Sequence, residues 1–271
     1  MQRFVSLILF AWTFAGALEE KPMVLVVPSY NNIEWYETCL ISMLAQNYHN
    51  FRIIYLDDCS RDGMSQAIDA FLLENDPEHR VQMIHNRIRI GALANIYYAV
   101  QSCDPDEIVV LVDGDDWLLH PDVLSQLNEI YSTQEVWFTH GNMKEWPAGH
   151  VTWCEPICEE ALLSRTYRAF KCPSHLRTFY AWLFQRIRYE DFLYEGQFFS
   201  MAWDMAIMYP IAEMAGRRHL FVEEPNYAYN MSNPINDNKV NAALQRKLDH
   251  YLRTCPPYPE LSQAKEWPYG R

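Results

Sequence analysis

The sequence predicts an α/β protein with a mixed, mostly parallel central sheet flanked by helices. Between residues 23 and 112, short runs of β-favouring apolar residues alternate with helix-forming stretches. One run, Ile108 to Val112, contains only apolar residues, which is typical of a strand buried on both faces of a sheet. Because strands that alternate with helices form βαβ units, neighbouring strands are expected to be parallel.

The alternation predicts each element of the first half in turn. The first strand is expected at Val24 to Val27, where β-branched residues dominate, and the first helix at Glu34 to Leu44. Two further strand–helix pairs and a last strand follow, expected at Phe51 to Leu56, Ser65 to Leu73, Val81 to Ile84, Ala92 to Val100 and Ile108 to Val112.

The regular alternation fades after Pro121. Tryptophans are scattered there among glycine, proline and charged residues, and two further helices are expected, at Asp204 to Ala215 and at Val240 to Leu252. An extended C-terminal tail is predicted from its prolines, which are Pro256, Pro257, Pro259 and Pro268. The chain therefore divides into residues 23–120, residues 121–252 and a proline-rich tail at 253–271.

The first seventeen residues have the pattern of a signal peptide. Arg3 supplies a basic start, Phe4 to Phe14 is mostly apolar, and Ala15-Gly16-Ala17 fits a cleavage site with small residues. The alternatives are an uncleaved anchor or an apolar first helix. A signal peptide predicts entry into the secretory pathway or export, with the lumen of the endoplasmic reticulum or Golgi as one destination. No later segment is expected to span a membrane.

Composition narrows the function classes. The 271 residues are 49% hydrophobic, which is enough for a substantial core, and the formal net charge of −13 argues against a nucleic-acid partner. The seven cysteines leave at least one unpaired. We expect buried thiols at Cys39, Cys59 and Cys103. One bridge is possible among three cysteines that lie close together in the sequence, Cys154, Cys158 and Cys172.

The motif Asp113-Gly114-Asp115-Asp116 directly follows the most apolar predicted strand. It therefore lies at the carboxyl end of that strand, where open α/β sheets bind their ligands. Carboxylates one residue apart form a hard-oxygen site suited to Mg²⁺ or Mn²⁺, and Asp113 and Asp115 are the candidate ligands. The alternative is a loop whose acids cap a helix that begins near Pro121.

Polar residues also follow the first three predicted strands. The first strand ends in Pro28-Ser29-Tyr30-Asn31, where the Tyr30 ring could stack on a base, and the second ends in Asp57 and Asp58, which could accept from a base N–H. After the third come Asn86, Gly91 and Asn95, and Gly91 would let a helix start approach a ligand closely. Each alone fits turn chemistry. Together with the acidic motif they favour a nucleotide-diphosphate site.

The segment from Val24 to Asp116 resembles the donor half of family 2 glycosyltransferases, which have the Rossmann-like GT-A fold. The order and spacing of the strand-end motifs above carry the resemblance, which covers roughly the first 120 residues. It implies a nucleotide-diphosphate sugar donor, most simply a UDP-sugar, a divalent metal (Mn²⁺ or Mg²⁺), and inversion at the anomeric carbon. The acceptor would be a carbohydrate, a glycan or a protein. On this basis residues 23–120 are the donor half and residues 121–252 the acceptor-binding and catalytic half.

The same resemblance implies roles for individual residues. Tyr30 and Asp57 would hold the base, Asp113 the ribose or a metal-bound water, and Asp115 the metal. The other donor-site candidates are Pro28, Asn31, Asp58, Asn86, Gly91, Asn95 and Gly114. Cys59 stands where the family commonly has glycine or another small residue.

A family 2 enzyme also needs a general base in its second half. Asp204 is the candidate, because it opens the predicted helix at Asp204 to Ala215, although an acid in that position could simply cap the helix. Trp203 could stack on an acceptor sugar, and His175 and Arg177 could contact a phosphate or the acceptor. Three competing acids lie just upstream, Glu190, Asp191 and Glu195.

One further hypothesis concerns a polar and aromatic loop. Tyr227, Tyr229, Asn230 and the stretch from Asn233 to Asp237 could close over a bound donor. Two other functions stay open: a non-catalytic nucleotide-sugar-binding protein of the same fold, and a metal-dependent phosphatase with a nucleophilic aspartate. The phosphatase is disfavoured because Trp117 stands where that class has Thr or Val. A sugar nucleotidyltransferase would need a Gly-rich loop after Val27, which is missing.

Overall fold

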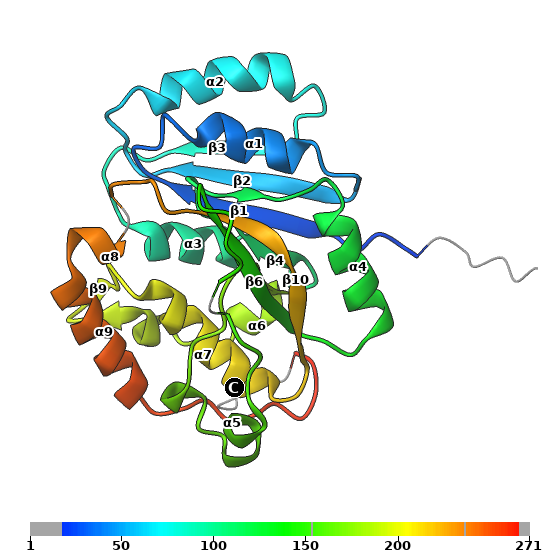
Figure 1. The fold of residues 1–271 in the computed structure, drawn as a ribbon, viewed down its shortest axis with the longest axis vertical. Helices are drawn as coiled ribbons and strands as arrows, with labels where there is room; N and C mark the ends of the chain where they lie inside the picture. Colours follow the sequence, from blue (N-terminus) through cyan, green and yellow to red (C-terminus); the bar gives the residue numbers. More distant parts are fainter. Residues whose placement is uncertain (1–17, 153, 236, 266–271) are drawn as a thin grey trace, which may run out of the picture.

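The computed structural model describes residues 18–152, 154–235 and 237–265. Within these residues a mixed sheet of eight strands has the order β3-β2-β1-β4-β7-β6-β10-β5 (Figure 1). The predicted signal peptide at residues 1–17 lies outside the described residues. None of the described helices is long and apolar enough to cross a membrane.

The first half follows the predicted alternation closely. Its strands β1 to β4 pair with one another in parallel, and every predicted element is present, with ends that shift by one or two residues. The elements are β1 (Met23–Ser29), α1 (Tyr36–Leu44), β2 (Phe51–Asp57), α2 (Met64–Asn75), β3 (Val81–His85), α3 (Ala92–Gln101) and β4 (Ile108–Leu111).

Burial on both faces explains the apolar strands. Alternate residues of β1 point into two separate cores, with Val24 and Val26 in one and Leu25 and Val27 in the other. Helices α1, α2 and α4 (Val123–Thr133) cover one face, and α3, α6 (Ala181–Phe184) and α7 (Trp203–Ala215) cover the other (Figure 1). The all-apolar run at β4 is therefore a central strand, as predicted.

The second half adds strands to the same sheet, which the sequence pattern did not predict. The added strands are β5 (Trp117–Leu118), β6 (Phe138–Trp146), β7 (Arg177–Tyr180) and β10 (His219–Asn230). Strand β7 runs antiparallel to both β4 and β6, and Arg177 pairs with Leu111 at the end of β4. The start of β7 therefore lies beside the acidic motif.

Smaller elements complete the second half. They are α5 (Glu159–Ser164), two 3-10 turns (Tyr167–Ala169 and Tyr189–Phe192), the hairpin β8 (Leu193–Tyr194) with β9 (Gln197–Phe198), α8 (Asp237–Val240) and α9 (Ala242–Thr254). A single helix was predicted at Val240 to Leu252, and its predicted start is wrong. Helix α8 ends at Val240, and Asn241 caps α9 by accepting from the Leu244 amide at 3.0 Å.

The residues after α9 pack onto α7, although an extended tail was predicted from their prolines. Tyr258 and Leu261 are each 2% exposed, and the Leu261 amide donates to the Met214 carbonyl. The anchor is a buried ion pair between Arg168 and Glu213 of α7, and Glu213 also accepts from the Tyr258 amide at 2.9 Å. The start of the tail is therefore part of the core.

The cysteine expectations are partly wrong. All seven cysteines are free thiols, so the bridge that was possible among Cys154, Cys158 and Cys172 is not formed. Cys39 and Cys103 are buried as expected, whereas Cys59 is partly exposed. Cys59 lies in the turn after β2 with a positive φ of 65°, which turns it out of the core.

Candidate active site

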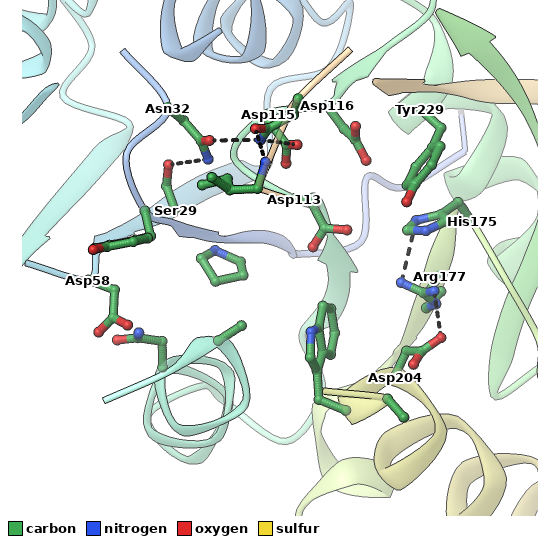
Figure 2. A pocket seen from close by; sticks show the side chains of 18 of the residues that line it. Ser29, Asn32, Asp58, Asp113, Asp115, Asp116, His175, Arg177, Asp204 and Tyr229 are labelled. Atoms are coloured by element: carbon green, nitrogen blue, oxygen red, sulfur yellow. Dashed lines mark hydrogen bonds and ion pairs between the residues drawn. The ribbon is translucent and has the colours of Figure 1, made fainter. Parts of the chain in front are cut away.

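A pocket of about 330 Å³ lies at the carboxyl ends of β1, β2 and β4 (Figure 2). The start of β7 and the first turns of α3 and α7 complete its wall. The pocket therefore gathers residues from both halves of the chain at the edge of the sheet where α/β proteins bind ligands.

Glycine is required within the acidic motif because the loop presses against β1. The Gly114 amide donates to the Pro28 carbonyl at 3.0 Å. A Cβ at Gly114 would lie 2.3 Å from Ser29 Oγ and 2.9 Å from the Ser29 Cα. Any side chain would thus push the loop away from β1, and Gly114 fixes where the neighbouring carboxylates lie.

Asp116 is the most buried acid of the motif. It is 1% exposed; its Oδ1 accepts from the Asn230 amide at 2.7 Å, and its Oδ2 has no hydrogen-bond partner among the described residues. Burial, then the charges of Asp115 and Asp113, raises the pKa of Asp116 well above its usual value. A buried carboxylate oxygen that accepts no hydrogen bond is a favourable ligand for a cation.

The donor atoms fit a divalent metal. One ligand atom each from Asp113, Asp116 and His175 lie within 4.8 Å of one another, and His175 comes from the segment just before β7. Carboxylate oxygens with one imidazole nitrogen suit Mn²⁺ and related ions. Asp115, the ligand predicted beside Asp113, lines the same pocket, but its Oδ2 accepts from Asn233 Nδ2 at 2.6 Å.

The His175 ring is buried, and neighbouring side chains fix its position. Its ring stacks on Tyr227 with centroids 4.6 Å apart, and burial, then the nearby Arg177 charge, lowers its pKa well below the usual value. The imidazole is therefore neutral, which is the form that binds metals. Tyr227 in turn fixes the acidic loop, because its hydroxyl accepts from the Asp113 amide at 2.9 Å.

The opposite end of the pocket is organised by Asp58. Its carboxylate accepts from the Ile90 and Gly91 amides at 2.9 and 2.8 Å and from Asn86 Nδ2 at 3.0 Å. Gly91 has a φ of 90°, which favours glycine at the start of α3. Asp58 thus holds the α3 loop against β2 and lines the pocket.

Asp57 occupies a different place from the one its predicted role suggested. It is 1% exposed, does not line the pocket, and accepts from the Ser60 amide at 3.0 Å and from the Ser65 hydroxyl. Burial, the largest single influence, opposes ionisation of Asp57, but these donors outweigh it and lower the pKa. Asp57 shapes the turn after β2.

Tyr30 lines the pocket near Asp58, and an arginine covers its ring. The Arg89 guanidinium lies 3.8 Å from the Tyr30 ring centroid and 3.8 Å from the Asp58 carboxylate. Arg89 was not predicted as a site residue, because a single arginine in a loop carries no signal of its own.

The second half contributes a buried cation and an acid. Asp204 opens α7, and its Oδ2 lies 3.1 Å from Arg177 Nη2 (Figure 2). The Arg177 guanidinium lies 5.7 Å from the Trp203 ring, and all three residues line the pocket. The three competing acids, Glu190, Asp191 and Glu195, do not line it.

The pocket brings together ten of the predicted residues: Pro28, Tyr30, Asp58, Asn95, Asp113, Asp115, His175, Arg177, Trp203 and Asp204. The other five, Asn31, Asp57, Asn86, Gly91 and Gly114, do not line it and instead belong to the loops that form it. The described lining residues that prediction missed include Ser29, Asn32, Arg89 and Asp116. Asp116 could have been found, because it completes the acidic motif.

The loop from Asn233 reaches the acidic motif from the far side. Asn233 Nδ2 donates to Asp115 and, at 3.2 Å, to Asn32 Oδ1. Tyr229, Asn233 and Ile235 line the pocket, so part of this loop lies at the candidate site. Residue 236 lies outside the described residues, and Asp237 begins α8.

Solved structures share this architecture. The Staphylococcus aureus TarS fragment 1–349 in complex with UDP-GlcNAc is 15% identical, with a TM-score of 0.59 over 78% of this chain and 59% of that chain. The mannosyltransferase PcManGT from Pyrobaculum calidifontis, in complex with GDP-Man and Mn²⁺, is 17% identical, with a TM-score of 0.60 over 87% of this chain and 63% of that one. These likenesses confirm the GT-A fold.

Sequence relatives cover a shorter stretch. Two glycosyltransferases of Streptococcus pneumoniae serotype 4 match, GlyG at 33% identity over 91 residues and GlyA at 28% over 102 residues. The matches span 34% and 37% of this chain, but only 29% of GlyG and 14% of GlyA. The family model described as glycosyl transferase family 2 matches residues 24–187, more than half of the chain. With its fold, its acidic motif and this match, the chain belongs to glycosyl transferase family 2.

Proposed function

We propose that the protein transfers a sugar from a nucleoside-diphosphate sugar to an acceptor hydroxyl, with metal assistance and with inversion at the anomeric carbon. One observation carries this proposal. The acidic motif after β4 and the carboxylate of Asp204 line the same pocket, although they come from opposite halves of the chain. A donor's diphosphate at the acidic motif and an acceptor hydroxyl at the first turn of α7 would therefore share one cavity.

The acidic loop supplies the site for the donor's diphosphate. Asp113 and Asp116, with His175, form a ligand set that fits a divalent cation, and Asp115 lines the pocket beside them. When bound there, such a cation would neutralise the charge that develops on the departing diphosphate. The loop itself is held in place, because Gly114 fits closely against β1 and the Tyr227 hydroxyl accepts from the Asp113 amide.

The far end of the pocket suits the nucleoside. Tyr30 offers an aromatic face and Asp58 a carboxylate, and Asn86 Nδ2 donates to both Asp58 and Asn95, which ties these two lining residues together. A UDP-sugar is proposed as the donor. Support comes from the TarS fragment, whose structure contains UDP-GlcNAc, whereas PcManGT contains GDP-Man.

Asp204 is proposed as the general base. A carboxylate at this place could take the proton of the acceptor hydroxyl as its oxygen attacks the anomeric carbon from the side opposite the diphosphate. Attack from that side inverts the configuration. Trp203, the neighbour of Asp204 on the pocket wall, offers a face on which an acceptor sugar can stack. The acceptor is proposed to be a carbohydrate, a glycan or a protein.

The first experiment measures release of nucleoside diphosphate from a panel of donors, comprising UDP-glucose, UDP-GlcNAc and GDP-mannose. Each donor is tested with Mn²⁺, with Mg²⁺ and with EDTA. We expect metal-dependent release from one donor and, once an acceptor is found, an inverted anomeric configuration by NMR. Binding of a donor without turnover, with or without candidate acceptors, would favour the non-catalytic alternative.

Two variants sharpen this experiment. Asp204→Asn should not weaken donor binding, but it should lower the transfer rate by about 10²- to 10⁴-fold, the usual contribution of a general base. Glu190→Gln is the matched control, because Glu190 is a nearby acid that does not line the pocket. Full transfer activity in Asp204→Asn would remove Asp204 as the base.

A further inference from the structure

Acidic side chains outnumber basic ones in the pocket, which disfavours the binding of a diphosphate unless a cation is present. Five carboxylates line the pocket, those of Asp58, Asp113, Asp115, Asp116 and Asp204. Among the described lining residues the two cations are Arg89 and Arg177. Arg89 lies over Tyr30, at the proposed nucleoside end, so of these two lining cations Arg177 is the one beside the end of β4 and the acidic loop.

Arg177 is buried but incompletely bonded. Its side chain is 5% exposed. Nη2 reaches Asp204 at 3.1 Å, Nη1 reaches His175 Nδ1 only at 3.4 Å, and Nε has no hydrogen-bond partner among the described residues (Figure 2). A guanidinium has five N–H donors in a rigid fork that matches phosphate oxygens. This side chain therefore keeps donor capacity that the protein itself does not use.

Arg177 lies between the acidic loop and Asp204. Pairing with Leu111 places it beside the end of β4, and its side chain reaches the first turn of α7. An arginine guanidinium does not lose its proton in folded proteins, and here its Nη2 lies 3.1 Å from an Asp204 carboxylate oxygen. Arg177 therefore carries its charge whether or not a ligand is present.

We propose that Arg177 is shared between Asp204 and the diphosphate of the donor, an inference that rests on the proposed function. Without donor, its guanidinium pairs with Asp204. Phosphate oxygens that arrive beside the acidic loop draw the guanidinium toward them, and this loosens its hold on Asp204. The carboxylate then becomes available to an acceptor hydroxyl only after the donor has bound.

Sharing of Arg177 would couple the charge of Asp204 to the affinity for a nucleoside diphosphate, which a purely structural ion pair would not do. If Asp204 competes with the diphosphate for one guanidinium, removal of the Asp204 charge must tighten the binding of a nucleoside diphosphate. The tightening must also require Arg177. A general loss of negative charge from the pocket would instead tighten binding with or without Arg177.

The test is a double-mutant cycle on the full chain, by isothermal titration calorimetry with UDP and with GDP in the presence of Mn²⁺. The four proteins are the wild type, Asp204→Asn, Arg177→Gln and the double variant. We expect Asp204→Asn to tighten diphosphate binding at least about fivefold, the lower end of typical coupling between sites. Arg177→Gln should weaken it, and Asp204→Asn should then have no effect in the Arg177→Gln background.

Controls separate this inference from misfolding and from failure of the proposed function. Uridine and guanosine lack phosphates, so their affinities should be the same in all four proteins. Arg177→Lys keeps the charge without the fork and should recover part of the diphosphate affinity. Equal tightening in both backgrounds, or none in either, would overturn the sharing of Arg177. A wild type that binds neither UDP nor GDP would instead overturn the proposed donor.

Discussion

Replacing Glu213 with glutamine tests how the second half of the chain is held together. Glu213 lies on α7, is 0% exposed and accepts from Arg168 Nε at 2.6 Å and Nη2 at 2.8 Å. Glu213→Gln keeps the shape of the side chain but removes its charge. Arg168, which is 8% exposed, would then be a buried cation without this counter-ion.

The expected cost follows from this geometry. Removal of one partner from a buried ion pair destabilises a protein by about 3 to 5 kcal/mol, because the remaining charge stays desolvated. The loss is large beside a total stability of about 5 to 15 kcal/mol. At about 2 to 4 °C per kcal/mol for a chain of this size, the midpoint of thermal unfolding should fall by about 6 to 20 °C.

Urea unfolding followed by circular dichroism measures the effect. The matched control is Glu159→Gln, which removes an acid from the solvent-exposed pair with Arg217 and should leave stability nearly unchanged. The double variant Arg168→Met with Glu213→Leu should regain most of the lost stability, because it removes both buried charges. A loss below about 1 kcal/mol in Glu213→Gln would refute the reasoning.

Three other predictions concern the pocket and the sheet. Gly114→Ala should cost about 1 to 3 kcal/mol and weaken Mn²⁺ binding, measured by urea unfolding and by electron paramagnetic resonance, because its Cβ would collide with Ser29. Asp116→Asn should weaken Mn²⁺ binding in the same resonance assay, and unchanged affinity would exclude Asp116 as a ligand. Burial, then the neighbouring His219, lowers the pKa of His140 from 6.5 to about 3. Between pH 6.5 and 3 the unfolded chain therefore binds a proton at His140 that the folded chain does not, and this lowers the free energy of unfolding as the pH falls. In His140→Phe, the slope of the free energy of unfolding against pH over this range should be shallower.

Most of the first half of the fold was predictable because three of its four strands, β1, β2 and β4, are buried on both faces. Such strands consist mostly of apolar residues, and Ile108 to Val112, which contains no polar residue, is the clearest case. Strands β6 and β10 were missed for the opposite reason. Lys144 and Glu145 interrupt β6, and β10 contains Pro225 and a register shift between Val222 and Tyr227. Strand β7 has only four residues, too few to show a period.

The candidate site was predictable where it depends on strand ends. Asp58 and Asp113 follow predicted strands, so their places could be inferred from the sheet edge. The sequence could not show whether Asp57 or Asp58 lines the pocket, because neighbouring residues of a strand point in opposite directions and the turn decides which one reaches the pocket. The place of Arg177 beside the acidic loop depends on antiparallel pairing of β7 with β4, which no local pattern encodes.

Strand β10 limits how this protein could be recombined with its relatives. Tyr227 and Asn230 come from the second half, yet they hold Asp113 and Asp116 of the first half by hydrogen bonds to backbone and side chain. A chimera that joins residues 23–120 to a foreign second half would lose these two contacts unless the foreign strand supplies the same side chain and amide. Successful exchanges of acceptor specificity should therefore replace loops and leave β10 with its own acidic motif.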